Sequence, residues 1–232
     1  MKINNLILVL ISILFLGCSS VKPDMEFYSI DIESSNKTAY FKHFNILAPI
    51  IKDENEAKKW NFLASDNIYS FNMGLNKYKD KKNVRWLKYS LEIQTYSGEN
   101  EKKGDKKFQY YSKEIEAIKN KDEKYLKEEY LEWTTWQNRG IISAKYSNVN
   151  KYPAIQIDMY KKYMNTDKYS KQYWLYSYSK TGKLKVYVIT ISVDIDKPNA
   201  DDPQLLVEYS FEDMLKRSQR SLDSFVASDE DF

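Results

Sequence analysis

The side chains that most often carry catalysis are scarce in this sequence. Its 232 residues include one cysteine, Cys18, and one histidine, His43. A Ser-His-Asp or Cys-His triad would need His43, which lies beside a predicted edge strand, and the chain has no nucleophile elbow. A zinc site built from histidine and cysteine needs more of these ligands than the chain has. We therefore expect neither a triad nor such a zinc site.

Carboxylates are the remaining candidates for catalysis or metal binding. Glu128, Glu129 and Glu132 fall on a predicted helix, whereas a glycosidase needs two carboxylates held across a cleft. Four aspartates between residues 194 and 202 could gather a calcium ion, but a solvated loop is the simpler interpretation, and no EF-hand spacing occurs. Gly182-Lys183 lacks the first glycine of a P-loop and precedes a strand. We expect no catalytic residue, no metal ion and no cofactor.

One stretch combines positive charge with aromatic side chains. Nine lysines and two acids lie between Ser143 and Lys185, together with eight tyrosines and Trp174. Aromatic rings beside lysines can stack on sugars, receive a cation or meet an acidic partner. The alternative is a tyrosine-rich strand face buried under a helix, with lysines at the rims that block edge aggregation. The candidate binding face comprises Tyr160, Tyr163, Trp174, Tyr176, Tyr178, Lys161 and Lys171.

The N-terminus has the pattern of an export signal. Lys2 is followed by an apolar run from Leu6 to Leu16, which is shorter than the roughly 20 residues that a membrane-spanning helix needs. No later stretch approaches that length, so we expect no conventional transmembrane helix. Residues 1–17 are predicted to be a signal peptide that is removed.

The junction Phe15-Leu16-Gly17-Cys18 resembles the lipobox of bacterial lipoproteins, although Phe15 stands where leucine is usual. The resemblance implies that Cys18 is acylated, becomes the new N-terminus and holds the chain on a membrane through two or three acyl chains. The alternative is an ordinary secretory signal with an incidental cysteine. Against it, a single exported thiol has no partner for an internal disulfide.

These features predict a lipoprotein of the bacterial cell envelope, on the outer membrane if the cell is Gram-negative. Residues 18–26 are then the lipidated cysteine and a short tether. The eight residues from Ser19 to Glu26 reach at most about 28 Å when fully extended, so the folded body should lie close to the bilayer.

The composition predicts one ordinary globular domain. The formal net charge of +3 includes Lys2 of the signal, so the exported chain is nearly neutral, and we expect no nucleic-acid binding. Six glycines and five prolines argue against disorder or collagen-like repeats. We predict a single α+β domain over residues 27–226 and a frayed acidic tail over residues 227–232.

The first half of the domain is predicted to contain three strands and one helix. The strands cover residues 25–32, 44–51 and 86–96, the last from its alternation of apolar and polar residues. Asp53 and Glu56 have the pattern of a capping box, which predicts a helix over residues 53–64. Residues 67–78 are ambiguous, a turn is expected at 80–83, and a solvated loop at 97–107.

The second half is predicted to contain two helices around four strands. A long amphipathic helix spans residues 112–136, and strands follow at 141–146, 154–163, 172–178 and 184–193. The last two strands form a hairpin around Gly182, and Val186–Val193 should be a central strand covered on both sides. A helix capped by Ser210 and Asp213 runs to Phe225. The predicted fold is α+β, an antiparallel β-sheet packed by amphipathic helices in an α/β/α sandwich.

The order of the final elements resembles the end of PsbP-like domains: a β-hairpin ending in an apolar strand, a loop, and a helix that closes on residues 221–225. The resemblance implies a sandwich fold that hosts mainly non-catalytic binding proteins. We predict a non-enzymatic lipoprotein that binds an envelope protein or an anionic envelope polymer. The alternatives are a cell-envelope glycan hydrolase that uses carboxylates, and an inhibitor or immunity-type lipoprotein.

Overall fold

The computed structural model describes residues 26–79, 82–97, 106–132, 140–163, 166–196 and 209–230. The predicted signal peptide, Cys18, the tether up to residue 25 and the end of the predicted helix 112–136 lie outside these ranges. Within them, antiparallel sheets are packed by helices, which confirms the α+β class. None of the helices in the described ranges combines the length and the apolar composition that crossing a bilayer requires.

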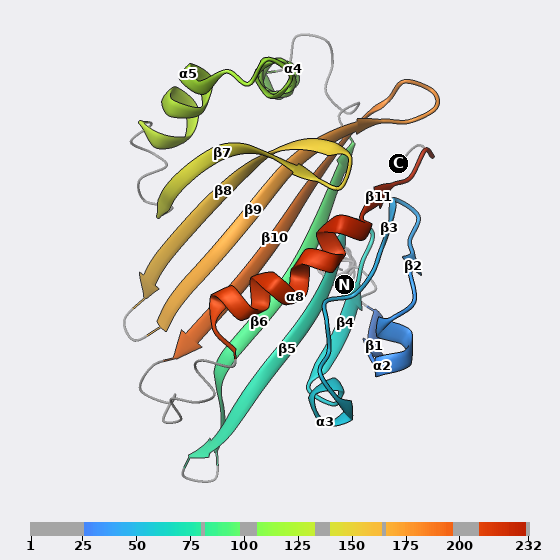
Figure 1. The fold of residues 1–232 in the computed structure, drawn as a ribbon, viewed down its shortest axis with the longest axis vertical. Helices are drawn as coiled ribbons and strands as arrows, with labels where there is room; N and C mark the ends of the chain where they lie inside the picture. The colour runs from blue at the N-terminus through green and yellow to red at the C-terminus, as the bar shows by residue number, and fades with distance from the viewer. Residues whose placement is uncertain are drawn as a thin grey trace, which may run out of the picture.

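The main sheet has eight antiparallel strands in the order β1-β4-β5-β6-β10-β9-β8-β7 (Figure 1). Strands β4 to β6 and strands β7 to β10 are two meanders, and the pairing of β10 with β6 joins them. In spatial order the strands are β1 (Glu26–Ser29), β4 (Trp60–Ala64), β5 (Ile68–Lys79), β6 (Lys82–Ser97), β10 (Leu184–Asp196), β9 (Thr166–Tyr178), β8 (Tyr152–Tyr163) and β7 (Ile141–Val149).

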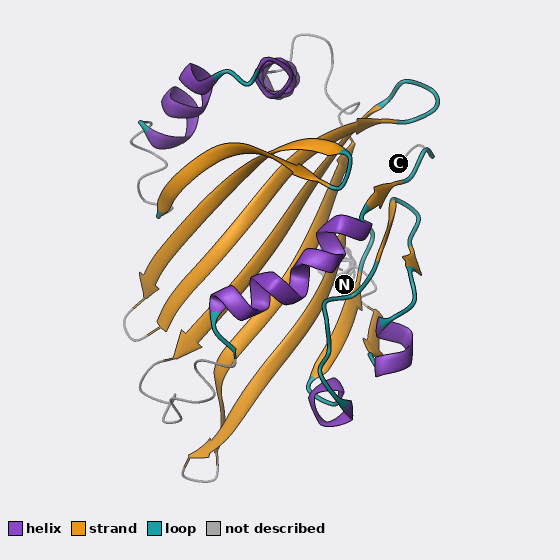
Figure 2. Ribbon diagram, in the orientation of Figure 1, coloured by secondary structure: helices purple, strands orange, loops and turns teal. Residues whose placement is uncertain are grey.

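Helices and a small second sheet pack around the main sheet (Figure 2). The second sheet has the order β11-β3-β2, with β11 (Val226–Ala227), β3 (Phe44–Ile46) and β2 (Ala39–Tyr40). The helices are α2 (Ile32–Ser35), α3 (Glu54–Ala57), α4 (Lys106–Asn120), α5 (Glu123–Leu126), a π-helical turn (Lys127–Leu131) and α8 (Phe211–Ser224).

Strand β10 separates two hydrophobic cores. Residues 186–193 are all buried except Thr190, which confirms the prediction of a central strand covered on both sides. Tyr187 and Ile189 belong to the larger core, together with Met214 of α8. Because side chains alternate along a strand, Val188 points to the opposite face. There a smaller core packs residues of α4, α5 and the π-helical turn against β8 and β9.

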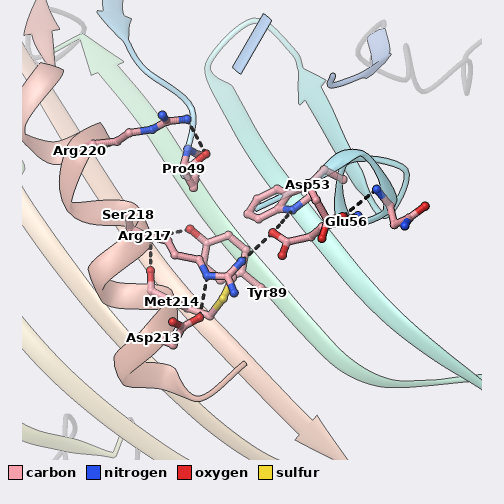
Figure 3. A network of polar contacts seen from close by, with 11 residues as sticks. Pro49, Asp53, Glu56, Tyr89, Asp213, Met214, Arg217, Ser218 and Arg220 are labelled. Carbon is pink, nitrogen blue, oxygen red and sulfur yellow. Dashed lines mark hydrogen bonds and ion pairs between the residues drawn. The ribbon is translucent and has the colours of Figure 1, made fainter. Parts of the chain in front are cut away.

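Helix α8 is fixed by a buried polar network to the face of the main sheet that carries the larger core (Figure 3). The guanidinium of Arg217 donates to Glu56 and to Asp213, each at 2.6 Å, and its side chain is 5% exposed. Glu56 also accepts a hydrogen bond from Trp60 Nε1 at 3.1 Å. Tyr89 of β6 is hydrogen-bonded to Ser218 at 2.6 Å. The network therefore joins α8 to the segment around α3 and β4 and to the central part of the sheet.

The helix predicted over residues 53–64 is wrong beyond its first turn. Asp53 does cap α3 by accepting from the backbone N–H groups of Asn55 and Glu56, but Trp60–Ala64 is strand β4. The carboxylate of Glu56 does not complete a capping box; it binds Trp60 and Arg217 instead. Strand pairing with β1 and β5 prevails over the local helix pattern in this segment.

The single helix predicted over residues 112–136 is also wrong. It is divided at Lys121, whose φ of 50° lies in the left-handed region and stops α4. Asp122 then caps a new helix by accepting from the backbone N–H of Tyr125 at 3.1 Å. Residues 67–78, ambiguous from sequence, belong to strand β5, and the predicted strand 44–51 is limited to β3.

The frayed tail predicted after residue 226 is wrong as far as Glu230. Strand β11 pairs with β3, and Ala227 is buried. Lys185, itself 1% exposed, donates its ammonium hydrogens to the carbonyl oxygens of Ser228 and Glu230. A buried cation and a strand pair therefore hold this segment on the domain.

The buried ion pair makes a first prediction. Arg217→Met leaves the carboxylate of Glu56 buried without its cation, and we expect a loss of about 3–5 kcal/mol in the free energy of unfolding, measured in urea. Adding Glu56→Gln removes the stranded charge and should restore part of this loss. Lys37→Met, which removes the exposed ion pair with Glu33, is the control and should change stability little. Equal effects of Arg217→Met and Lys37→Met would contradict the role of the network.

Candidate functional site

A hollow of about 610 Å³ lies on the face of the main sheet that carries the smaller core, between the π-helical turn and strands β7 to β10. Its volume is within the range of known ligand sites, about 300–1,000 Å³. Five strands and helices contribute to it, so the hollow depends on the whole second half of the fold. Its lining residues are Tyr130, Ile141, Ile157, Met159, Lys161, Tyr163, Thr166, Lys168, Ser170, Gln172, Trp174, Thr190 and Asp194.

Strand register arranges the floor of the hollow in rows across β8, β9 and β10. The rows change from apolar and aromatic side chains beneath the helices to charged side chains at the far end. Trp174 and Lys168 are six residues apart on β9, or about 20 Å at about 3.3 Å per residue. From the helices to the far end, the rows of paired residues are Ile155-Trp174-Val188, Ile157-Gln172-Thr190, Met159-Ser170-Ser192 and Lys161-Lys168-Asp194. Ile155, Val188 and Ser192 belong to these rows but do not line the hollow.

The charged row carries a net positive charge. Lys161 and Lys168 are direct partners on neighbouring strands. Asp194 Oδ1 lies 3.6 Å from Lys168 Nζ, an ion pair longer than a hydrogen bond. Of the described residues that line the hollow, Asp194 alone is acidic. Like charges placed directly opposite each other destabilise a sheet, so the Lys161–Lys168 pair does not stabilise the fold.

The structure divides the predicted binding face into three groups. Trp174, Lys161 and Tyr163 line the hollow. Tyr176 and Tyr178 line a second, smaller hollow of about 400 Å³ between α4 and strands β7 to β9. The other two, Tyr160 and Lys171, lie on the opposite face of the sheet, so the seven residues do not form one surface.

The placement of Tyr160 and Lys171 corrects the prediction. The ring of Tyr160 packs against that of Tyr169 in a tilted arrangement, with centroids 5.0 Å apart, and its hydroxyl donates to Asp167 at 3.0 Å. Lys171 forms an ion pair with Asp158 at 3.4 Å. Both follow from strand alternation, because residues an odd number of positions apart point to opposite faces.

The cationic stretch from residue 143 to 185 does not form one patch either. Two of its nine lysines, Lys161 and Lys168, line the hollow. Lys162 and Lys145 are exposed on the other face, and Lys185 is buried against the C-terminal segment. Of the positive charge concentrated in residues 143–185, one pair of ammonium groups is therefore present at the site.

The alternative interpretation, a tyrosine-rich strand face buried under a helix, applies to part of the predicted binding face. Tyr176 donates its hydroxyl hydrogen to Glu114 of α4, and its ring packs against the smaller core. Trp174 also contacts that core, but it borders the hollow and is partly exposed. Tyr178 and Tyr163 are each 56% exposed. Trp174 thus marks the boundary between the covered and the open parts of the sheet.

Glu114 is a buried carboxyl group that joins three elements. Tyr130 of the π-helical turn donates to one of its oxygens and Tyr176 of β9 to the other. Burial raises the pKa of Glu114 to about 7, and these two hydrogen bonds lower the pKa without cancelling that effect. Because Tyr130 lines the larger hollow and Tyr176 the smaller, Glu114 fixes the wall between them.

The remaining candidates for chemistry lie elsewhere. His43 is buried beside Tyr69, and burial lowers the pKa of its imidazole. Glu128 and Glu129 are on the π-helical turn and do not line the hollow. Among the residues that the structure describes, no three histidine, cysteine, aspartate or glutamate side chains gather as a metal site would require. The arrangement can bind a ligand through apolar contacts, hydrogen bonds and positive charge.

Sequence reasoning missed Lys168 and Glu114 as parts of the site. Lys168 was counted with the other lysines, and its position opposite Lys161 depends on the register of β8 and β9. Glu114 did carry a signal, because it lies three and four residues before the buried Ala117 and Ile118 and so falls on the apolar stripe of its helix. An acid on such a stripe indicates a buried carboxyl group that needs partners.

Comparison with known proteins gives a structural match at low sequence identity and no family. No protein-family model matches the chain, and no curated protein matches it. A crystal structure from Bacteroides thetaiotaomicron VPI-5482 aligns over 88% of this chain and 49% of its own, with 8% identity and a TM-score of 0.38. The chain therefore spans about half the length of that protein. The lipoprotein and PsbP-like resemblances stay predictions.

Glu114 gives a prediction on pH. Folding raises its pKa from 4.5 to about 7, so the folded state binds the proton more tightly and stability falls as the pH rises through this window. Replacing Glu114 with glutamine (Glu114→Gln) removes this loss. The free energy of unfolding of the variant relative to wild type should rise by about 2 kcal/mol or more between pH 5 and pH 8.

The matched control for this measurement is Glu116→Gln, which alters an exposed residue of the same helix. Its difference from wild type should be almost constant over the same pH range. If the Glu114→Gln variant and the wild type had parallel stability profiles, the buried carboxyl group would not titrate as described.

Proposed function

We propose that this chain is a lipoprotein of the bacterial cell envelope, anchored through acyl groups on Cys18, that binds an envelope ligand without catalysing a reaction. The hollow over β8, β9 and β10 is the observation that carries the proposal. It combines the volume of a ligand site with apolar, hydrogen-bonding and cationic side chains that converge from separate strands.

The shape and charge of the hollow favour an anionic polymer over a partner protein. A stable protein interface buries a broad patch of about 800 Å² on each side, whereas a segment of a chain-like ligand fits a concave site. The positive row formed by Lys161 and Lys168 complements a negative charge on such a ligand. An envelope polymer near the membrane is therefore the ligand class that we propose.

The same lining favours binding over hydrolysis. A glycosidase uses a pair of carboxyl groups, one of which supplies a proton. In the described lining the only carboxylate is that of Asp194, which is paired with Lys168. Glu114, the carboxyl group with a pKa near 7, is enclosed by Tyr130 and Tyr176 and is not exposed to the hollow.

The anchor is tested by metabolic labelling. In a bacterial host that processes lipoproteins, the wild-type chain should incorporate a palmitate analogue and fractionate with membranes. Cys18→Ser removes the sulfur that accepts the lipid and should abolish the label. Ser19→Ala, a change of similar size at the next residue, should keep it. Persistent labelling of the Cys18→Ser chain would refute the anchor.

Binding in the hollow is tested by filling it. Ser170 points into the hollow, so Ser170→Trp should occupy the space that a ligand needs. The full anchored chain in lipid nanodiscs is incubated with an envelope extract, and the retained molecules are identified by mass spectrometry. We expect retention to fall at least about tenfold, as when a favourable contact is replaced by a clash.

Thr181→Trp provides the control, because Thr181 is exposed in the turn between β9 and β10, away from the hollow. Thermal unfolding should show that both variants fold. The same retention by the Ser170→Trp variant and the wild type would place the site elsewhere, and no retained molecule with the wild type would contradict a binding function.

A further inference from the structure

We infer that the hollow takes a short acidic oligosaccharide, with a carboxylate or phosphate at the Lys161–Lys168 pair and an uncharged sugar ring against Trp174. This inference rests on the proposed binding function and adds the chemical class and the orientation of the ligand.

The lysine pair supports the acidic group. Lys161 and Lys168 face each other across β8 and β9, and the one acid in the described lining, Asp194, lies 3.6 Å from Lys168. The pairing of the two lysines destabilises the sheet, because like charges are placed directly opposite each other. An anion between the two ammonium groups would accept charge-assisted hydrogen bonds from both and relieve this repulsion.

The middle of the floor supports a sugar. On β8 the side chains are apolar, Ile157 and Met159, whereas β9 and β10 contribute Gln172, Ser170 and Thr190. A sugar ring has apolar C–H faces and hydroxyl edges, so it matches a floor that is apolar along one side and polar along the other. An acyl chain would cover these amide and hydroxyl groups without replacing the water that they lose.

Trp174 supports a stacked ring at the other end. Its indole Nε1 donates to Gln172 Oε1 at 3.3 Å, which fixes the orientation of the indole at the border of the hollow. The large apolar face of an indole is well suited to the C–H face of a sugar. Tyr130, which lines the hollow from the π-helical turn, is held in place by its hydrogen bond to Glu114.

The length of the floor favours an oligosaccharide over a single sugar. The lysine pair and Trp174 are about 20 Å apart along β9, a distance that one ring cannot bridge. Occupying both ends therefore requires several linked units, with the acidic group located toward the far end of the strand pair.

The test uses the full chain in nanodiscs on an array of short acidic oligosaccharides, some bearing carboxylates and others phosphates. Each acidic saccharide has a neutral partner made by esterification or dephosphorylation, and immobilised palmitate is included. We expect acidic saccharides to bind at least about tenfold more tightly than their neutral partners, and the affinity to fall as salt is raised. Preference for carboxylates or for phosphates then identifies the source of the charge.

The variants test the orientation. Lys161→Met with Lys168→Met should reduce acidic-saccharide binding about 10- to 100-fold, and thermal unfolding should show that the double variant is folded. Lys145→Met with Lys162→Met removes two exposed lysines from the opposite face and should leave binding unchanged. Trp174→Ala should weaken acidic saccharides and their neutral partners by the same factor.

Several results would overturn the inference. These are binding of palmitate alone, no preference for acidic over neutral saccharides, no saccharide bound, or equal loss from the two lysine double variants. If palmitate bound and the Ser170→Trp variant blocked it, the binding function of the hollow would stand and the saccharide assignment would fall. If the envelope extract and the array both gave nothing, the binding function would fall as well.

Discussion

The covering of strand β10 on both faces is the constraint on which the rest of the structure depends. Its backbone pairs with β6 over residues 185–195 and with β9 over residues 184–196, so neither edge is open along these lengths. Since its side chains on both faces are apolar, two separate layers must cover it. Helix α8 and the small sheet supply one, and the segment from α4 to the π-helical turn supplies the other. The hollow lies beside that second layer, over the rows of the sheet that extend from Trp174 toward Lys168.

Local patterns were sufficient where a single element determined its own conformation. The alternation in β6, the apolar strand β10, its hairpin with β9 and the cap of α8 at Ser210 were all predicted from neighbouring residues. The predictions were wrong where the conformation of a segment depends on a distant strand or on the backbone angle of one residue. Trp60–Ala64 became a strand because β1 and β5 lie on either side of it. Nothing in a lysine at position 121 signals a positive φ, so the division of the predicted long helix was not foreseeable.

The candidate site shows the same division between local and distant information. Trp174, Lys161 and Tyr163 were found because aromatic and cationic residues are concentrated in that stretch. Tyr160 was grouped with Tyr163, although residues three apart on a strand must face opposite ways. The row Lys161-Lys168-Asp194 exists only because three strands are in register. The partners of Glu114, Tyr130 and Tyr176, are 16 and 62 residues away along the chain. Helix and strand periodicity relates only residues a few positions apart, so it could not predict these contacts.

The order of strands also has a mechanical consequence for the proposed lipoprotein. Strand β1, which directly follows the tether, is one edge of the sheet, and β9, at the middle of the hollow, is five strands away. At about 4.8 Å per strand this is an offset of about 24 Å between the pivot and the binding surface. For a chain anchored at Cys18, rotation about the end of β1 would move the hollow along an arc instead of turning it in place. One anchored molecule could therefore reach polymer over an area around its anchor, because the width of the sheet separates the binding surface from the point of attachment.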